Sequence, residues 1–165
     1  MNLDTLINSN AVISSSDIKS KKRALELLAE TLTENVISTN QQAPTDSINT
    51  LEIFQLLTER EKLGSTSIGH GVALPHTRTS LTDHAIGAFL KLKDGIDFDS
   101  PDEQKTDLIF ALMVPEHYTD EHLKILAYLA TLFNDEAFCK TMRNTGNNKE
   151  IYHHLINWPL TSQAS

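Results

Sequence analysis

The chain has 165 residues with 14 basic and 22 acidic side chains, so its formal net charge is −8. Nucleic-acid binding needs a cationic surface that displaces counterions. The one dense basic run, Lys19 to Arg23, is typical of a solvated helix face, so we expect no nucleic-acid partner. No run reaches the ~20 consecutive apolar residues of a transmembrane helix, so we expect no membrane insertion.

The length fits one domain with a sizeable core, and a hydrophobic content of 39% is typical of a globular protein. The single cysteine, Cys139, excludes an internal disulfide and a cysteine-rich zinc site. The first residues, MNLDTLINSNAVISSSD, lack the basic and apolar segments of a secretory signal. These features predict a cytoplasmic protein.

The first half of the chain predicts two helices followed by a glycine-rich loop. Apolar residues recur at helical spacing from Lys19 to about Val36. After a polar turn, Asp46 or Ser47 can cap a second helix, which ends near Lys62. Residues 63–71, LGSTSIGHG, contain three glycines and three small hydroxyl residues, which predict a loop or a short irregular strand.

Strands are predicted in the middle of the chain. Val72 to Leu74 enter the sheet, and Pro75 ends their pairing because it has no N–H. Residues 84–93 alternate as a strand does, and an Asp-Gly turn then leads to a short strand at 96–98. Residues 106–114, TDLIFALMV, form a nearly continuous apolar run, which is typical of a central strand buried on both faces.

Three helices are predicted after the last strand, at about 120–134, 135–143 and 147–157. The first of them has little polar face, so we expect it to be well buried. Helices, then strands, then helices indicate an α/β or α+β fold with a mixed sheet flanked by helices. The whole chain is expected to form one domain, with its core at about 3–156 and a frayed tail at 158–165.

The stretch GHGVALPH at 69–76 ends in a histidine held by a proline. The ring of His76 is open to three interpretations: a core residue, a metal ligand or a nucleophile. A neutral imidazole is a good nucleophile toward phosphorus near pH 7. Arg60 offers a planar fork that fits a phosphoryl group. His122 falls in the first turn of a predicted helix, where the helix dipole favours negative charge.

The glycine-rich loop adds backbone donors to this set. The N–H groups of such a loop can turn toward an anion, and the candidate phosphate-loop residues are Gly64, Ser65, Thr66, Gly69 and Gly71. A histidine nucleophile, an arginine clamp, a loop of amides and a helix start together predict a site that accepts a phosphoryl group. The chain has no GxxxxGK[ST] loop and no kinase motif, so we expect the donor to be another phosphorylated protein rather than ATP.

The remaining histidines have plainer interpretations. His153 and His154 lie on the predicted terminal helix and are expected at the surface, while His84 and His117 are expected to be incidental. No HExxH or paired Cys/His signature is present, so we expect no metal and no cofactor. A metal-dependent hydrolase using His70, His76 and His122 is kept as an alternative.

Three segments of the chain resemble one known family: SKKRALELLAE at 20–30, TEREKLGSTSIGHGVALPH at 58–76, and TDLIFALMVPEHYTDEHLKILAYLATLF at 106–133. They are similar to the enzyme IIA domain of the bacterial phosphoenolpyruvate-dependent phosphotransferase system, of the fructose/mannitol type. Within that type the chain looks most like the nitrogen-related regulatory branch. The resemblance covers about residues 3–156.

The resemblance implies a compact α/β fold whose mixed sheet is flanked by helices. It implies that His76 is phosphorylated on Nε2, that Arg60 holds the phosphoryl oxygens, and that His122 hydrogen-bonds the phosphoryl group. The implied donor is a histidine-containing phosphocarrier protein of the nitrogen-related branch, charged by an enzyme I-type kinase that uses phosphoenolpyruvate. The implied regulated targets include potassium-transport and sensor proteins.

The chain departs from the family pattern at three positions. Ser67 stands where a glycine is usual, His70 where an asparagine is usual, and Thr77 where a small residue follows the active histidine. None of these departures removes a group that the chemistry needs, so they bear on the shape of the loop and on partner preference. We expect His70 on the surface of the loop.

Two further functions compete with a regulatory phosphoprotein. An enzyme IIA of a fructose/mannitol-type uptake system passes its phosphoryl group to a IIB domain and then to incoming sugar. A structural interaction domain never carries phosphate at all. The closeness of residues 58–76 to the nitrogen-related branch favours a regulator whose phosphorylation state alters its binding to target proteins.

Overall fold

The computed structural model describes residues 1–39 and 49–160. The elements in chain order are two short 3-10 helices (Leu3–Thr5 and Ser9–Ala11), β1 (Val12–Ser15), α1 (Lys21–Thr39), α2 (Thr50–Lys62), β2 (Ser67–Gly69), β3 (Val72–Ala73), β4 (His76–Thr79), β5 (Ile86–Ile96), β6 (Thr106–Pro115), α3 (Asp120–Phe133), α4 (Glu136–Asn144) and α5 (Asn148–Asn157). None of the described helices is long and apolar enough to cross a membrane.

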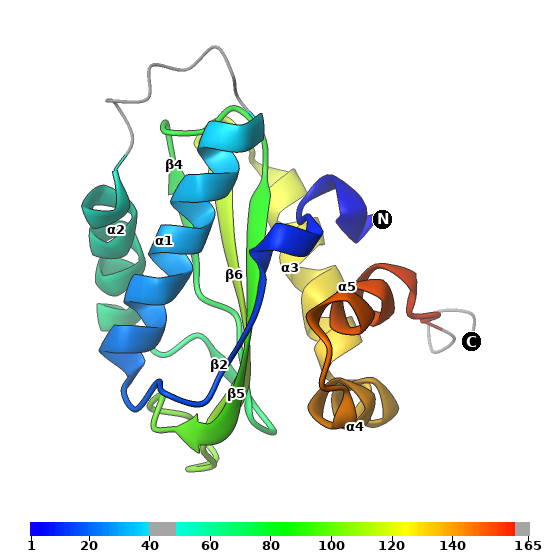
Figure 1. The fold of residues 1–165 in the computed structure, drawn as a ribbon. Helices are drawn as coiled ribbons and strands as arrows, with labels where there is room; N and C mark the ends of the chain where they lie inside the picture. The colour runs from blue at the N-terminus through cyan, green and yellow to red at the C-terminus, as the bar shows by residue number, and fades with distance from the viewer. Residues whose placement is uncertain (40–48, 161–165) are drawn as a thin grey trace.

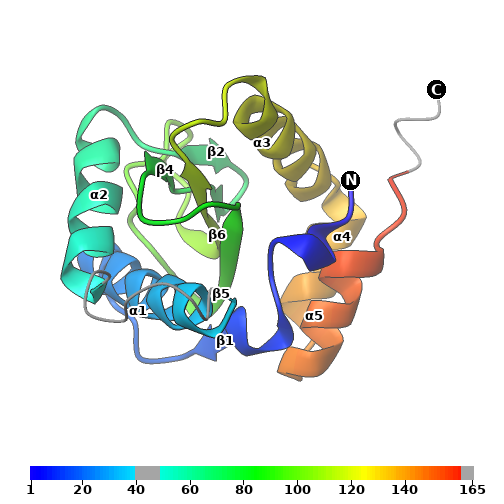
Figure 2. The ribbon, with the colours of Figure 1, turned by 90° about the horizontal axis from the view of Figure 1, so that it is seen from above.

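Two layers of helices enclose one sheet. Figure 1 shows α1 and α2 on one side of the sheet and α3, α4 and α5 on the other, and Figure 2 shows the same arrangement from above. The sheet is mixed, with strand order β1-β5-β6-β3-β2 and with β4 also paired to β6. This architecture confirms the predicted α/β fold.

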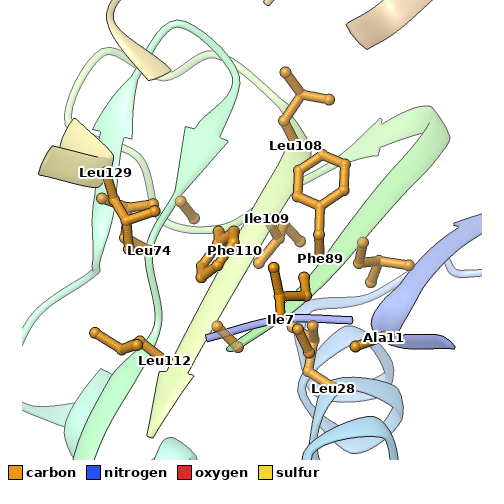
Figure 3. Packing of buried hydrophobic residues seen from close by; sticks show 14 of the residues in the cluster. Ile7, Ala11, Leu28, Leu74, Phe89, Leu108, Ile109, Phe110, Leu112 and Leu129 are labelled. Atoms are coloured by element: carbon orange, nitrogen blue, oxygen red, sulfur yellow. The ribbon is translucent and has the colours of Figure 1, made fainter. Parts of the chain in front are cut away.

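Strand β6 is the centre of the sheet, as its apolar run predicts. It pairs antiparallel with β5 on one side and parallel with β3 and β4 on the other. Its residues from Leu108 to Val114 are almost completely buried. Figure 3 shows Phe110 of β6 and Phe89 of β5 within this core, and the ring of Phe133 at the end of α3 lies 5.8 Å from that of Phe89.

Strands β3 and β4 lie one after the other along the same side of β6. Val72 pairs with Leu108, whereas His76 pairs with Leu112. Pro75 separates the two strands because it has no N–H to donate, although its carbonyl still accepts from the N–H of Leu112 at 2.8 Å. The end of pairing at Pro75 was predicted, but the new strand that starts at His76 was not.

Strand β5 is longer than predicted. It continues to Ile96, so the expected turn at Asp94-Gly95 and the separate strand at 96–98 are wrong. The register shifts between Lys91 and Ile96, which is an irregularity of the ladder rather than its end. At Gly95 a Cβ atom would lie only 2.8 Å from that of Lys105, so the glycine serves close strand approach here and not a turn.

The N-terminal cap of α2 and the burial of α3 can be compared with their predictions. The described cap of α2 is Asn49, whose side chain accepts from the N–H of Glu52 at 2.8 Å; the predicted caps Asp46 and Ser47 lie outside the described residues. Helix α3 has the predicted extent, but its burial is incomplete because Leu123 is 57% exposed. Apolar spacing alone does not reveal whether another element covers each face of a helix.

The chain beyond α5 is anchored at Trp158. Its indole N–H donates to Asp135 at 3.0 Å, and its ring lies 5.3 Å from that of Phe138. Residue 158 therefore packs on the start of α4. The rest of the predicted tail, residues 161–165, lies outside the described residues.

We predict that Gly71→Ala destabilises the protein, because Gly71 has a φ of +81° and a new Cβ would lie 2.5 Å from Nη2 of Arg143. The left-handed backbone alone costs about 1–2 kcal/mol for a residue with a side chain, so we expect a loss of about 2 kcal/mol or more in urea unfolding. Gly146→Ala is the control, since nothing lies within 4 Å of its Cβ position. Equal unfolding free energies for the two variants would contradict this account.

Candidate active site

His76 is the first residue of β4 and is half-buried. Its backbone is fixed on one side by pairing with Leu112 of β6 and on the other by Pro75. Helix α2 packs beside β4, and Figure 1 shows the two elements next to each other. The ring therefore projects from a rigid part of the sheet and is neither sealed in the core nor on a free loop.

A hydrogen bond to the backbone sets the tautomer of His76. Its Nδ1 lies 2.9 Å from the carbonyl oxygen of Leu74. A carbonyl can only accept, so Nδ1 carries the proton of the neutral ring and Nε2 keeps its lone pair. The nitrogen that is free to attack an electrophile is therefore Nε2.

The surroundings keep this ring neutral. Burial lowers the pKa of His76 below its ordinary value of 6.5, and the charges of Arg60 and His122 lower it further. The Leu74 carbonyl and the carboxylate of Glu61 act in the opposite direction, but burial is the largest cause. At pH 7 the ring is therefore mostly in its nucleophilic form.

Arg60 is placed by the end of α2. Its Nη1 donates to the carbonyl oxygen of Gly64 at 3.0 Å, where the chain leaves the helix. This bond holds the guanidinium with a neutral acceptor, so its positive charge is retained. This positive charge lowers the pKa of His76, so the guanidinium and the imidazole interact electrostatically.

His122 lies in the first turn of α3, as predicted. Its Nδ1 is buried and has no hydrogen-bond partner among the described residues. Buried polar atoms are seldom left unpaired, and the electrostatic effect of His122 on the pKa of His76 shows that the two rings interact. The structure thus brings His76, Arg60 and His122 into one region from three different elements.

A buried carboxylate that no sequence pattern predicts, Glu61, braces this region. It accepts from the N–H of Thr66 at 3.2 Å and from the Thr66 hydroxyl, and Lys21 at the start of α1 pairs with it at 2.9 Å. The carbonyl of Thr66 in turn accepts from the N–H of Leu74 at 3.0 Å. A continuous chain of bonds therefore runs from α1 through Glu61 to the carbonyl that orients His76.

The predicted phosphate loop divides into two parts. Its first part is held by three contacts. The carbonyl of Gly64 accepts from Arg60, the carbonyl of Thr66 accepts from the N–H of Leu74, and the Ser65 hydroxyl donates to the carbonyl of Phe98 at 2.7 Å. Gly69 and Gly71, in contrast, form the tip of the β2–β3 hairpin, with φ values of 86° and 81°.

The hairpin tip is far from His76. The carbonyl of Gly71 accepts from the N–H of Leu108, whereas His76 lies opposite Leu112. Four residues of strand span about 13 Å, so the structure does not bring Gly69 and Gly71 to the candidate nucleophile. The expectation of one glycine-rich loop beside His76 is corrected to the segment from Gly64 to Thr66.

His70 is also at this hairpin tip. It is exposed, its N–H donates to Asp102 at 2.9 Å, and its carbonyl accepts from Arg143 at 2.7 Å. It is therefore separated from His76 and His122, so the three histidines of the hydrolase alternative do not converge. Within the described part of the chain, no group of three or more His, Cys, Asp or Glu side chains is placed to hold a metal ion.

Comparison with known proteins identifies the family. Residues 5–158 match the model of the family described as "Phosphoenolpyruvate-dependent sugar phosphotransferase system, EIIA 2". The chain belongs to this family. It is 35% identical over 162 residues to a nitrogen regulatory protein of Bradyrhizobium diazoefficiens, covering 98% of this chain and 99% of the relative. It is 34% identical over 153 residues to the Escherichia coli K12 nitrogen regulatory protein, covering 92% and 88%.

Solved structures agree with this placement. The chain resembles the nitrogen regulatory protein IIA-Ntr of Neisseria meningitidis with a TM-score of 0.82 and 31% identity, covering 93% of this chain and 98% of that one. The mannitol IIA protein of Escherichia coli has a TM-score of 0.67 at 18% identity, covering 90% and 97%. The second likeness shows only that the EIIA fold is shared.

We predict that Glu61→Gln lowers the pKa of His76 below that of the native protein, because a negative charge that favours the protonated ring is removed. NMR titration of the ring measures this shift directly. We also expect a loss of about 1–3 kcal/mol in unfolding free energy, since a buried charged partner is lost. Glu59→Gln, an exposed change on the same helix, is the control. An unchanged His76 pKa in Glu61→Gln would show that the carboxylate does not act on the ring.

Proposed function

We propose that this chain is a cytoplasmic enzyme IIA component that accepts a phosphoryl group on Nε2 of His76. The observation that supports this most directly is the hydrogen bond from Nδ1 to Leu74, because it leaves the Nε2 lone pair unprotonated. Arg60 and His122 support it further, since the charges of both act on the pKa of His76 and Nδ1 of His122 has no hydrogen-bond partner among the described residues.

The proposed transfer is a displacement at phosphorus. The lone pair of Nε2 forms the new P–N bond while the P–N bond of a donor phosphohistidine breaks, and its electron pair returns to the donor ring. Nδ1 keeps its proton throughout, so the Leu74 carbonyl holds the ring in the same orientation before and after transfer. The protein contributes in-line positioning and stabilisation of charge on the phosphoryl oxygens by Arg60 and His122.

The proposed donor is a histidine-containing phosphocarrier protein, charged by an enzyme I-type kinase from phosphoenolpyruvate. The family description names a phosphoenolpyruvate-dependent system. Two exposed leucines offer an apolar contact for such a donor: Leu63, which is 85% exposed and follows α2, and Leu123, which is 57% exposed and follows His122.

The proposed output is regulation rather than sugar uptake. The relatives that match almost the whole chain are named nitrogen regulatory proteins. A fructose-specific EIIABC component of Bacillus subtilis matches over 88 residues, which are 53% of this chain and 14% of that protein. The proposed targets are proteins such as potassium transporters or sensors.

Charge is the proposed switch. Phosphorylation adds about −1.5 to −2 charges at neutral pH, on a chain that already carries −8. An acidic partner surface that binds near the bare imidazole is then repelled. The two exposed leucines remain unchanged, so the switch acts through electrostatics and not through apolar contact.

We predict that incubation with phosphoenolpyruvate, enzyme I and phosphocarrier adds one acid-labile, base-stable phosphoryl group, and that His76→Ala abolishes it. Arg60→Gln is expected to slow the transfer by about 10²–10³-fold, the usual cost of losing one donor to a transition-state oxyanion. Lys62→Gln removes an exposed positive charge from the same helix end and serves as control. A native protein that gains no mass, or a His76→Ala variant that does, would refute the phosphoryl-acceptor proposal.

We further predict that a target captured by the unphosphorylated protein binds His76→Asp at least about tenfold more weakly, because a carboxylate supplies part of the phosphoryl charge. His76→Asn, a variant without that charge, is the matched comparison. Pull-down followed by titration measures both affinities. Equal affinities for the two variants would contradict a charge switch, and stoichiometric transfer to a IIB domain would favour the sugar-uptake alternative.

A further inference from the structure

A polar pocket lies away from His76, toward the other end of the sheet. Its volume is about 490 Å³, and its lining includes Ser14, Ser16, Lys91, Lys93 and Arg143. Ser14 of β1 lies level with Lys91 of β5, which in turn lies level with Leu108 of β6. His76 lies opposite Leu112, so the pocket is separated from it by about 13 Å along the strand.

The pocket lies where open α/β sheets commonly bind ligands. β1 and β5 run parallel, and ligands of such sheets bind beyond the carboxyl ends of parallel strands. Ser14 of β1 and its partner Lys91 of β5 lie on the same face of the sheet, and Ser16 follows directly after the end of β1. Contacts with 145–148 show which side this is: Lys91 donates to the carbonyl of Thr145 and Ser14 donates to the side chain of Asn148.

The charge of the pocket is opposite to that of the chain. Three cations, Lys91, Lys93 and Arg143, line it with a single carboxylate, Asp107. Arg143 binds that carboxylate with two nitrogens, each at 2.9 Å from an oxygen, so this pair is largely neutralised. Neither Lys91 nor Lys93 forms an ion pair with a carboxylate among the described residues. Two lysine charges therefore remain for a ligand.

Lys91 is held ready for an anion. Its ammonium donates one of three N–H groups to the Thr145 carbonyl at 2.6 Å, which fixes the side chain without cancelling its charge. Burial lowers the pKa of Lys91, so the protein alone does not fully stabilise its positive charge. The N-terminal end of α5 begins just after Gly146, another lining residue, and its dipole adds to the positive potential.

We propose that this pocket binds a small organic anion that carries a phosphoryl group. Its volume lies in the range of small-molecule sites, about 300–1,000 Å³. The planar guanidinium that suits a carboxylate is already occupied by Asp107. The remaining charged donors are the two ammonium groups of Lys91 and Lys93. Their two charges match the charge of one phosphoryl group at neutral pH, about −1.5 to −2, better than the single charge of a carboxylate.

The test uses the full chain and NMR titration with inorganic phosphate, glycerol 3-phosphate and succinate. We expect saturable shifts with glycerol 3-phosphate at the amides of Ser14 to Ser16 and of Gly146, in both the native protein and His76→Ala. Lys93→Gln should weaken this binding about tenfold, as expected when one charged contact is lost. Lys22→Gln, which removes an exposed lysine from α1, should bind as the native protein does.

Several results would overturn the proposal. Shifts centred on Gly64 to Thr66 that vanish in His76→Ala would place the anion at the phosphoryl-acceptor site instead. Native affinity in Lys93→Gln, or no saturation in the native protein, would remove the second site altogether. Succinate binding as tightly as glycerol 3-phosphate would refute the phosphoryl class. Because binding to His76→Ala is measured without any phosphoryl transfer, failure here is distinguishable from failure of the proposed function.

Discussion

The hydrogen bond between Nδ1 of His76 and the carbonyl of Leu74 is the constraint on which the candidate chemistry depends. It decides which ring nitrogen carries the proton, and so which one can attack. A carbonyl two residues earlier reaches the ring because Pro75 interrupts the strand between them and leaves Leu74 outside the β-ladder. The proline that ends one strand therefore also orients the nucleophile at the start of the next.

The residue that carries this carbonyl, Leu74, is itself held through its N–H by a chain of contacts that reaches α1. Leu74 donates to Thr66, Thr66 donates to Glu61, and Glu61 pairs with Lys21 of α1. A buried carboxylate is costly unless it is paired and hydrogen-bonded, and Glu61 satisfies both conditions. The same carboxylate raises the pKa of His76 while burial lowers it. The brace that fixes the geometry thus also moderates how strongly the ring resists protonation.

The sequence predicted the fold class, the central strand and five helices because these follow from apolar periodicity, which is local. The choice of His76, Arg60 and His122 as site residues came partly from residue type and partly from family resemblance, and it stays a prediction. The prediction of strands and loops failed where the structure depends on pairing between strands that are distant in the sequence. Gly95 reads locally as a turn but lies inside β5, opposite Lys105. Gly69 and Gly71 belong to a hairpin tip whose distance from His76 is set by the register on β6. Glu61 carries no motif, and only its buried contacts reveal it.

The basic side chains of this acidic protein differ in what they bind: some pair with a carboxylate, and others donate to a backbone carbonyl. Lys21 is paired with Glu61 and Asp99, and Arg143 is paired with Asp107. The positive charges of these two side chains are therefore neutralised by carboxylates of the same protein. Arg60 and Lys91 are held instead by backbone carbonyls, of Gly64 and Thr145. A carbonyl fixes a side chain but leaves its unit charge uncancelled, and partial burial strengthens the attraction of that charge for an anion. Arg60 acts electrostatically on His76, and Lys91 lines the polar pocket. The two anion sites that we propose therefore share one physical device, a cation held by a backbone carbonyl, within a protein whose net charge is negative.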